Sequence, residues 1–370
     1  MPRKIAIIGW LVTAAACAQT PPQKPAMSDQ VFKNVRILKG IPVDEFMATM
    51  GFFSASLGET CTDCHSAESG GSWAKYADDN PRKNTARAMI GIMNAINKNY
   101  FGGKREITCY SCHRGVERPD VTPSLADLYG PPQMKEPDQF REPAGKTQSP
   151  DQILDKYIQA IGGADRLSKI TSFAAKGTYQ GYQDEKHPVD VFAKAPDQLT
   201  TIVHTSAGDS ATTFDGRTGW IAGPATERPV ALLELTGTDL TGARLDAALA
   251  FPARLPQALT QWRTGASPAI DWHDVQMLQA TGDGRYPVNL YFDSKSGLLL
   301  RLVRYTDSPV GLNPTQIDYA DYREVAGVRM PFLVTVTWLD GKSITQLTEI
   351  QPNAPMDAAR FERPAAPVKH

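Results

Sequence analysis

The sequence predicts an α+β protein, in which a small all-α unit precedes a larger antiparallel, β-rich domain. In the first part, apolar residues recur every three or four positions over 43–57 and 85–100, and a Cys-x-x-Cys-His motif follows each stretch. In the second part, from Asp151 onward, short alternating stretches are separated by hairpin-type turns. The 370 residues are enough for at least two domains.

The overall charge excludes one class of function. Lys and Arg number 39 and Asp and Glu number 40, so the formal net charge is −1. A protein that binds nucleic acid as its main task carries a basic excess. We therefore expect no nucleic-acid partner.

Residues 1–18 are typical of an export signal, with Arg3 and Lys4 ahead of an uncharged apolar stretch over 5–16. That stretch is shorter than the roughly 20 residues of a membrane span. Two processing routes remain open: cleavage after Ala18 would release a soluble protein, whereas a degenerate lipobox would leave Cys17 lipidated. Both routes predict a periplasmic protein, attached to the membrane only if Cys17 carries lipid. Residues 19–27 form a Pro-rich tether.

A compact unit is expected over residues 28–120, built on two amphipathic helices. The first helix is predicted over Val43–Leu57 and ends at Gly58, three residues before the first motif. The second is predicted over Thr85–Tyr100 and ends at Gly102-Gly103. The unit therefore contains a weak internal repeat of helix, loop and motif.

The motifs Cys61-Thr-Asp-Cys64-His65 and Cys109-Tyr-Ser-Cys112-His113 carry the chemistry. A c-type haem needs two thiols spaced to reach its vinyl groups and a histidine directly after them as the proximal iron ligand. The alternatives are a Cys₄ zinc site, a redox Cys pair or structural disulfides. None of these requires the histidine in both copies. We predict two covalent c-type haems, with Cys61, Cys64, Cys109 and Cys112 as thioether cysteines and His65 and His113 as iron ligands.

Methionines on the two helices are candidates for the sixth iron ligand. Met50 serves the first haem, and Met89 or Met93 the second; aligning the two repeats pairs Met50 with Met89. A methionine on an apolar helix face is otherwise a core residue. A second histidine ligand would have to come from the β-rich domain, at His187, His204, His273 or His370.

Residues 121–150 are a Pro-rich linker, either extended or lying along the surface. The β-rich domain is expected over 151–365, beginning with a helix over Gln152–Ile161. A more helical stretch, interrupted by prolines, is expected over 239–259. The strands that we predict are 277–280, 288–292, 298–305, 332–339 and 344–350.

Residues 31–47 (VFKNVRILKGIPVDEFM), 56–61 (SLGETC) and 97–101 (NKNYF) resemble the cytochrome c subunit of bacterial photosynthetic reaction centres. The resemblance covers about residues 28–119 and implies a helix before each haem, with Met50 as an axial ligand. It places His65 and His113 at the proximal positions and the four cysteines at the thioether positions. The family's subunits carry four haems, and this chain resembles their C-terminal half. In that half the last haem takes a distal histidine from the N-terminal half, whereas here the helix offers Met89 and Met93.

The β-rich domain looks similar to the open β-barrel carriers of the outer-membrane lipoprotein pathway. The sequence as a whole predicts a periplasmic dihaem cytochrome that relays single electrons between redox partner proteins, among them a photosynthetic reaction centre. One alternative is a peroxidase-like haem enzyme with an open iron site. Another is a C-terminal module that binds a lipid or a quinone, with an accessory electron-transfer unit.

Overall fold

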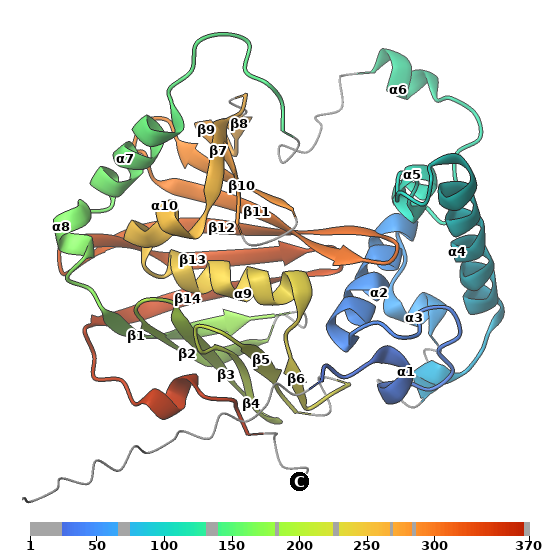
Figure 1. Cartoon of the computed structure of the whole chain (residues 1–370), viewed down its shortest axis with the longest axis horizontal. Coiled ribbons are helices and arrows are strands. Elements are labelled where there is room, and N and C mark those ends of the chain that lie inside the picture. Colours follow the sequence, from blue (N-terminus) through green and yellow to red (C-terminus); the bar gives the residue numbers. More distant parts are fainter. Residues whose placement is uncertain are drawn as a thin grey trace, which may run out of the picture.

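The computed structural model describes residues 24–65, 75–130, 140–181, 185–224, 229–266, 269–282 and 286–365. A small helical unit lies beside one end of a large, curved antiparallel sheet (Figure 1). The expected α+β fold is confirmed. The signal segment with Cys17, the turn at Asp283-Gly284, and His370 lie outside the described residues.

The helical unit is built on two long helices, α2 (Val43–Leu57) and α4 (Pro81–Tyr100). Short elements complete it: α1 (Ser28–Val31), α3 (Cys61–Cys64), η2 (Lys75–Ala77), α5 (Cys109–His113) and α6 (Leu125–Tyr129). Helix α2 has the bounds that the periodicity predicts and ends at Gly58, whose φ of 67° is left-handed. Helix α4 begins four residues before the predicted start. The side chain of Asn80 accepts the backbone N–H of Lys83 at 3.0 Å, and Pro81 takes the first helical position.

The β-rich domain opens with α7 (Pro150–Ala160) and α8 (Ala164–Leu167). Its strands are β1 (Ser172–Gln180), β2 (Lys186–Lys194), β3 (Gln198–Thr205), β4 (Gly208–Phe214), β5 (Gly219–Ala222), β6 (Leu232–Glu234), β7 (Thr260–Thr264), β8 (Ala269–Ile270), β9 (His273–Thr281), β10 (Pro287–Asp293), β11 (Leu299–Ser308), β12 (Gly311–Val325), β13 (Val328–Trp338) and β14 (Gly341–Pro352). Between β6 and β7 lie α9 (Gly237–Leu249), η3 (Pro252–Arg254) and α10 (Leu255–Ala258), and η4 (Ala358–Phe361) follows β14.

The main sheet has the order β6-β5-β4-β3-β2-β1-β14-β13-β12-β11-β10-β9-β7, with β8 paired to β9, and every pairing is antiparallel. The sheet is open, because β6 and β7 at its two ends do not pair with each other. Each of the five predicted strands lies in or largely within an observed one. Two tight hairpin loops, Pro309–Val310 between β11 and β12 and Leu339–Asp340 between β13 and β14, lie at the end of the sheet that faces the helical unit.

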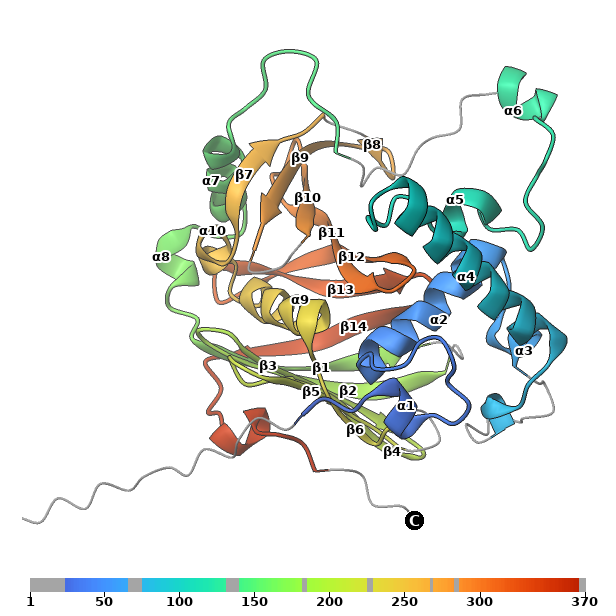
Figure 2. The ribbon, with the colours of Figure 1, turned by 45° about the vertical axis from the view of Figure 1, so that its right-hand side comes forward.

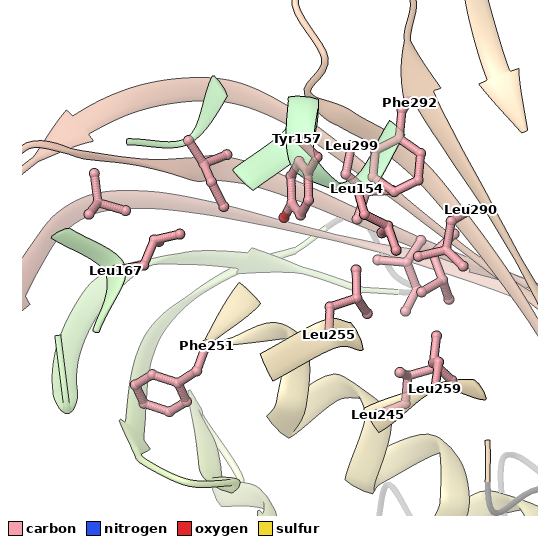
Figure 3. Packing of buried hydrophobic residues seen from close by; sticks show 14 of the residues in the cluster. Leu154, Tyr157, Leu167, Leu245, Phe251, Leu255, Leu259, Leu290, Phe292 and Leu299 are labelled. Atoms are coloured by element: carbon pink, nitrogen blue, oxygen red, sulfur yellow. The ribbon is translucent and has the colours of Figure 1, made fainter. Parts of the chain in front are cut away.

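The main core lies between the sheet and the helices on its concave face. Helix α7 contributes Leu154 and Tyr157, α9 contributes Leu245, and β10 contributes Phe292. Figure 3 shows these side chains converging from the helices and from the sheet. Each such side chain stabilises the fold by roughly 1.5–3 kcal/mol through burial.

The segment expected as a linker contains α6 and then returns to the sheet. The guanidinium of Arg263 on β7 lies 3.6 Å from the ring centre of Phe140, and Thr264 donates to the backbone oxygen of Gln148 at 2.9 Å. The last part of this segment therefore lies along the sheet edge. Among the described residues, no helix is long and apolar enough to cross a membrane.

Candidate functional site

The two Cys-x-x-Cys-His motifs form matching single helical turns, α3 and α5. Each turn begins after a threonine that caps it. Thr60 donates its backbone N–H to Asp63 at 2.7 Å, and Thr108 donates its backbone N–H to Ser111 at 3.1 Å. Sequence analysis missed this capping box, although a threonine three residues before Asp or Ser is its signal. The turn sets the two sulfurs and the following histidine in a fixed relation.

Both histidines are oriented through Nδ1. His65 Nδ1 lies 2.9 Å from the backbone oxygen of Tyr76, and His113 Nδ1 lies 3.1 Å from that of Val116. Because a carbonyl only accepts, each ring donates through Nδ1 and leaves Nε2 as the nitrogen available to a metal. Burial, with the charge of Lys83, lowers the pKa of His65 and favours its neutral form, in which Nε2 keeps a lone pair. This is the arrangement that a proximal haem ligand needs.

The thiols lack the lowered pKa that marks a catalytic redox pair. All four are free of disulfides. Burial raises the pKa of Cys61, Cys64 and Cys109, whereas a catalytic Cys-x-x-Cys has a lowered thiol pKa. The two motifs also do not meet: no group of three or more metal-ligating side chains forms among the described residues. The four cysteines are therefore not gathered into one group in this structure.

Helix α4 connects the two motifs through an asparagine at each end. Asn80, its cap, donates to the backbone oxygen of Cys64 at 2.7 Å. Asn97, in its last turn and only 6% exposed, donates to the backbone oxygen of Ile107 at 2.7 Å and accepts from the N–H groups of Glu106 and Ile107. One helix thus positions the end of the first motif and the start of the second.

The end of α2 packs directly against the second motif. Gly115 donates its backbone N–H to Ser56 at 2.9 Å, and a Cβ added to Gly58 would lie 2.2 Å from the oxygen of Gly115. Only glycine fits this approach in a left-handed conformation. The two repeats are therefore packed together rather than strung along the chain.

The candidate axial methionines differ in exposure. Met50 on α2 is partly buried. On α4, Met93 is 6% exposed and packs with Phe52 and Val310, whereas Met89 is 41% exposed. Met93 is thus buried among apolar side chains, and Met89 is not.

The described histidines of the β-rich domain are engaged by carboxylates of that domain. His204 lies 2.8 Å from Asp209, which raises the pKa of the histidine, and His273 lies 3.3 Å from Asp293. His187 lies 3.7 Å from Glu185. None of these contacts brings a histidine to the two motifs.

The hairpin loops of the sheet pack against the helical unit. Val310, fully buried, lies in a cluster with Phe52 and Met93, and a Cβ added to Gly311 would meet the Phe52 ring at 2.2 Å. Arg105 donates to Asp307 at 2.5 Å and also to the backbone oxygen of Ser308. These contacts join residues about two hundred positions apart, and for that reason the sequence pattern does not show them.

The other hairpin loop lies beside the first motif. The carboxylate of Asp340 lies 3.1 Å from a Cβ placed on Gly51, next to Met50, and its charge contributes to the raised pKa of Cys61. Burial raises the pKa of Asp340 itself. The β-rich domain thus places a carboxyl group, exposed at the tip of a hairpin loop, next to one motif.

The donor set at each motif fits a c-type haem, because a pair of free thiols and an imidazole oriented through Nδ1 are present at both. Large apolar side chains of the helical unit are also exposed, among them Ile92 (53%) on α4 and Tyr110 (54%) within the second motif. An apolar macrocycle would cover side chains of this kind.

Comparisons with known proteins agree with this geometry. Residues 10–145 match the family model of the photosynthetic reaction centre cytochrome C subunit. The photosynthetic reaction center cytochrome c subunit of Thermochromatium tepidum is 36% identical over 92 residues, which are 24% of this chain and 22% of that protein. The chain thus spans less than a quarter of that relative's length.

The β-rich domain is similar to two solved structures at low identity. A LolA superfamily protein from Nitrosomonas europaea has a TM-score of 0.40 and 14% identity, over 58% of this chain and 98% of that chain. A DUF1329 family protein from Desulfovibrio piger has a TM-score of 0.42 and 11% identity, also over 58% and 98%.

Proposed function

From the match of residues 10–145 to the reaction-centre cytochrome family, we propose that this chain is a dihaem c-type cytochrome that relays single electrons outside the cytoplasm. The observation that carries the proposal is the duplicated geometry. Each motif is a capped turn whose histidine donates through Nδ1 to a backbone oxygen and leaves Nε2 for iron.

The roles of the residues follow from this geometry. Cys61 and Cys64 would hold one haem, and Cys109 and Cys112 the other, with His65 and His113 as the proximal ligands. The haem iron, when bound, supplies the one-electron change. The protein orients each imidazole through its Nδ1 hydrogen bond, and burial favours the neutral form of His65.

Met50 is proposed as the axial ligand of the first haem and Met89 as that of the second. Met89 is preferred because its side chain is accessible, while Met93 is packed against Phe52 and Val310. A neutral thioether raises the reduction potential relative to a second imidazole. Both haems would then be carriers of comparatively high potential rather than open catalytic sites.

The setting of the protein is part of the proposal. Export through residues 1–18 would deliver it to the periplasm, with Cys17 as the point of lipid attachment if the lipobox is used. Its partners would be redox proteins, with a photosynthetic reaction centre as the first candidate. That candidate rests on the family of the helical unit.

The haem count tests the proposal. We expect a pyridine haemochrome assay on the full chain, matured in a host that attaches c-type haem, to give two covalent haems. The double variants Cys61→Ala/Cys64→Ala and Cys109→Ala/Cys112→Ala should each give one. Cys17→Ala is the matched control and should keep two while losing any attached lipid. Fewer than two haems in the unchanged chain would overturn the proposal.

A second candidate function concerns the β-rich domain. A cavity of about 840 Å³ lies between α9 and the concave face of the sheet, and most of its lining is apolar, for example Leu199, Phe214 and Val334. Its size is in the range of small-molecule sites. We propose that the domain binds an apolar or amphipathic small molecule, which gives the chain a binding function beside electron transfer.

A further inference from the structure

The cavity runs along one face of α9. Asp239, Ala243, Asp246 and Ala250 line it, at a spacing of three or four residues. Helix α9 has 13 residues and is therefore about 20 Å long. The cavity is long enough for a molecule with a ring and an extended chain.

One wall of the cavity carries polar side chains that we call the inner polar set: Asp239 and Asp246 on α9, Arg304 on β11 and Tyr319 on β12. Arg304 donates to Asp246 at 3.1 Å. Burial raises the pKa of Tyr319, and the charge of Asp246 adds to the rise. Burial, together with the carboxylates of Asp44 and Glu45, raises the pKa of Asp239 to about 6.

The inner polar set has unused hydrogen-bonding capacity. Among the described residues, Asp246 Oδ1 and Arg304 Nε are buried without a hydrogen-bond partner. A buried polar atom without a partner costs roughly 1–3 kcal/mol. The set thus retains both a donor and an acceptor that a ligand lying against it could use.

Gly242 makes room for the guanidinium of Arg304. A Cβ on Gly242 would lie 2.3 Å from an Arg304 nitrogen. Gly242 lies between the two acidic positions on α9. The glycine therefore fixes where the cation of the set sits, and an alanine there would displace it.

The Asp239 end of the cavity faces the helical unit. Thr236, just before α9, donates its N–H and hydroxyl groups to Asp44 on α2 at 3.1 and 3.0 Å. Thr238 accepts the N–H of Asp307, the residue paired with Arg105. Figure 2 shows this end of α9 beside α2. A ligand at the inner polar set would be held next to the haem-bearing unit.

The other end of the cavity is cationic. Arg254 on η3 and Arg329 on β13 line it there, both exposed. No ion pair of either arginine occurs among the described residues. The cavity thus has an acidic inner end, with two carboxylates and one guanidinium, and a basic outer end.

We propose that this cavity binds a quinone-class molecule with a chain, its ring against Asp246, Arg304 and Tyr319 and its chain directed toward α8. The inference rests on the proposed electron-transfer function, because it places a redox-active small molecule beside the haem unit. The carbonyl oxygen of a quinone accepts from Arg304, and the hydroxyl group of the reduced form donates to Asp246. The same set therefore suits both forms of one ligand.

The charges argue against an anionic amphiphile in this orientation. Its head would meet two carboxylates at the inner end, so that it would have to reverse and place its head at Arg254 and Arg329. Its apolar chain would then lie against the inner polar set and leave those groups unpaired. A neutral ring with oxygen atoms avoids both costs.

The test compares two ligands and three variants of the full, mature chain loaded with both haems. Isothermal titration calorimetry with decylubiquinone should show one saturable site. Arg304→Gln should weaken binding about tenfold or more, as expected for a lost hydrogen bond to a charged group. Gly242→Ala should weaken it comparably while both charged partners remain, and so covers the case in which Arg304→Gln does not fold. Arg254→Gln, at the opposite end of the cavity from the ring, keeps the inner polar set intact and should weaken binding much less than Arg304→Gln.

Palmitate tests the alternative occupant of the cavity, an anionic amphiphile. Absence of palmitate binding together with the variant pattern above supports the proposal. Palmitate binding that Arg254→Gln weakens and Gly242→Ala does not would overturn it in favour of an anionic amphiphile. No binding of decylubiquinone by a chain that carries two haems would also overturn it, and would leave the cytochrome function standing because the haem count is measured separately.

Discussion

The two Cys-x-x-Cys-His motifs share one local design and have different surroundings. Helix α2, before the first motif, is packed between the rest of the unit and the β-rich domain, with Val43, Thr49 and Phe52 buried. Helix α4, before the second motif, leaves Met89 and Ile92 exposed and contributes only Ile90, Met93 and Asn97 to the interior. Repetition of a motif thus fixes how a haem is attached, while the neighbouring domain makes the two sites unequal.

The largest effect that would sharpen this comparison is loss of an axial ligand at one site. We expect Met50→Leu and Met89→Leu each to remove about half of the near-infrared charge-transfer band of methionine-ligated ferric haem and to give one high-spin haem. Leucine keeps the apolar volume, so the fold should persist. Optical and electron paramagnetic resonance spectra of the oxidised protein measure both changes.

Met93→Leu is the matched control, one turn away on the same helix. It should leave the band intact, because Met93 packs against Phe52 and Val310. A band that survives Met89→Leu and is halved by Met93→Leu would assign the second ligand to Met93 instead.

The next effect is the pH dependence of the free energy of unfolding, which should involve α2 more than α4. Asp44 and Glu45 lie in the first turn of α2, and their charges contribute to raising the pKa of Asp239 to about 6, while Arg304 opposes the rise. Between about pH 4 and about pH 6 the folded protein therefore holds a proton that the unfolded chain has lost. The free energy of unfolding should fall as pH rises through that window, by at most about 3 kcal/mol, and level off above it.

Asp239→Asn should reduce that slope and raise stability near neutral pH, without a comparable change at acidic pH. Urea unfolding at the two pH values measures the slope. Hydrogen exchange should show amide protection in α2 rising in the variant and protection in the first turn of α4, which has no acidic residue, unchanged. A slope in Asp239→Asn equal to that of the unchanged chain would contradict the role of Asp239. Part of the slope should remain in the variant, because burial also raises the pKa of Asp44 and Glu45.

The smallest effect is electrostatic and should distinguish the two haems directly. Asp340 lies beside Gly51 and near Cys61, at the first motif only. Asp340→Asn removes a negative charge that favours the oxidised iron, so the potential of the first haem should rise by a few tens of millivolts. Spectroelectrochemical titration resolves the two haems. Asp209→Asn, at a carboxylate paired with His204, is the control and should shift neither reduction potential. An equal shift of both potentials with Asp340→Asn would contradict the proposed difference between the two sites.

The sequence was most informative where structure is set locally. The period of apolar residues and Gly58 together predict both ends of α2. The start of α4 was predicted four residues late because the periodicity gives no apolar residue there. The signal that marks it, an asparagine cap followed by proline, acts through one hydrogen bond.

The parts that sequence analysis missed depend on contacts between distant segments. Strand β12 was not predicted, and its first residue, Gly311, packs on Phe52 from the other end of the chain. The inner polar set likewise joins α9 to two strands that follow it by dozens of residues. No periodicity of either segment encodes such a pairing. The cysteines and histidines, in contrast, could be singled out as candidate haem-attachment residues because that motif is contiguous in the chain.

The hairpin loop at Val310 determines whether the helical unit can be separated from the β-rich domain. Val310 is fully buried against Phe52 and Met93, and Arg105 is held by Asp307 and the backbone of Ser308. A fragment ending near residue 120 would keep both Cys-x-x-Cys-His motifs and yet expose the apolar side chains that this loop covers. The helical unit is therefore not a self-contained module, because part of its surface is complementary to the domain fused to it.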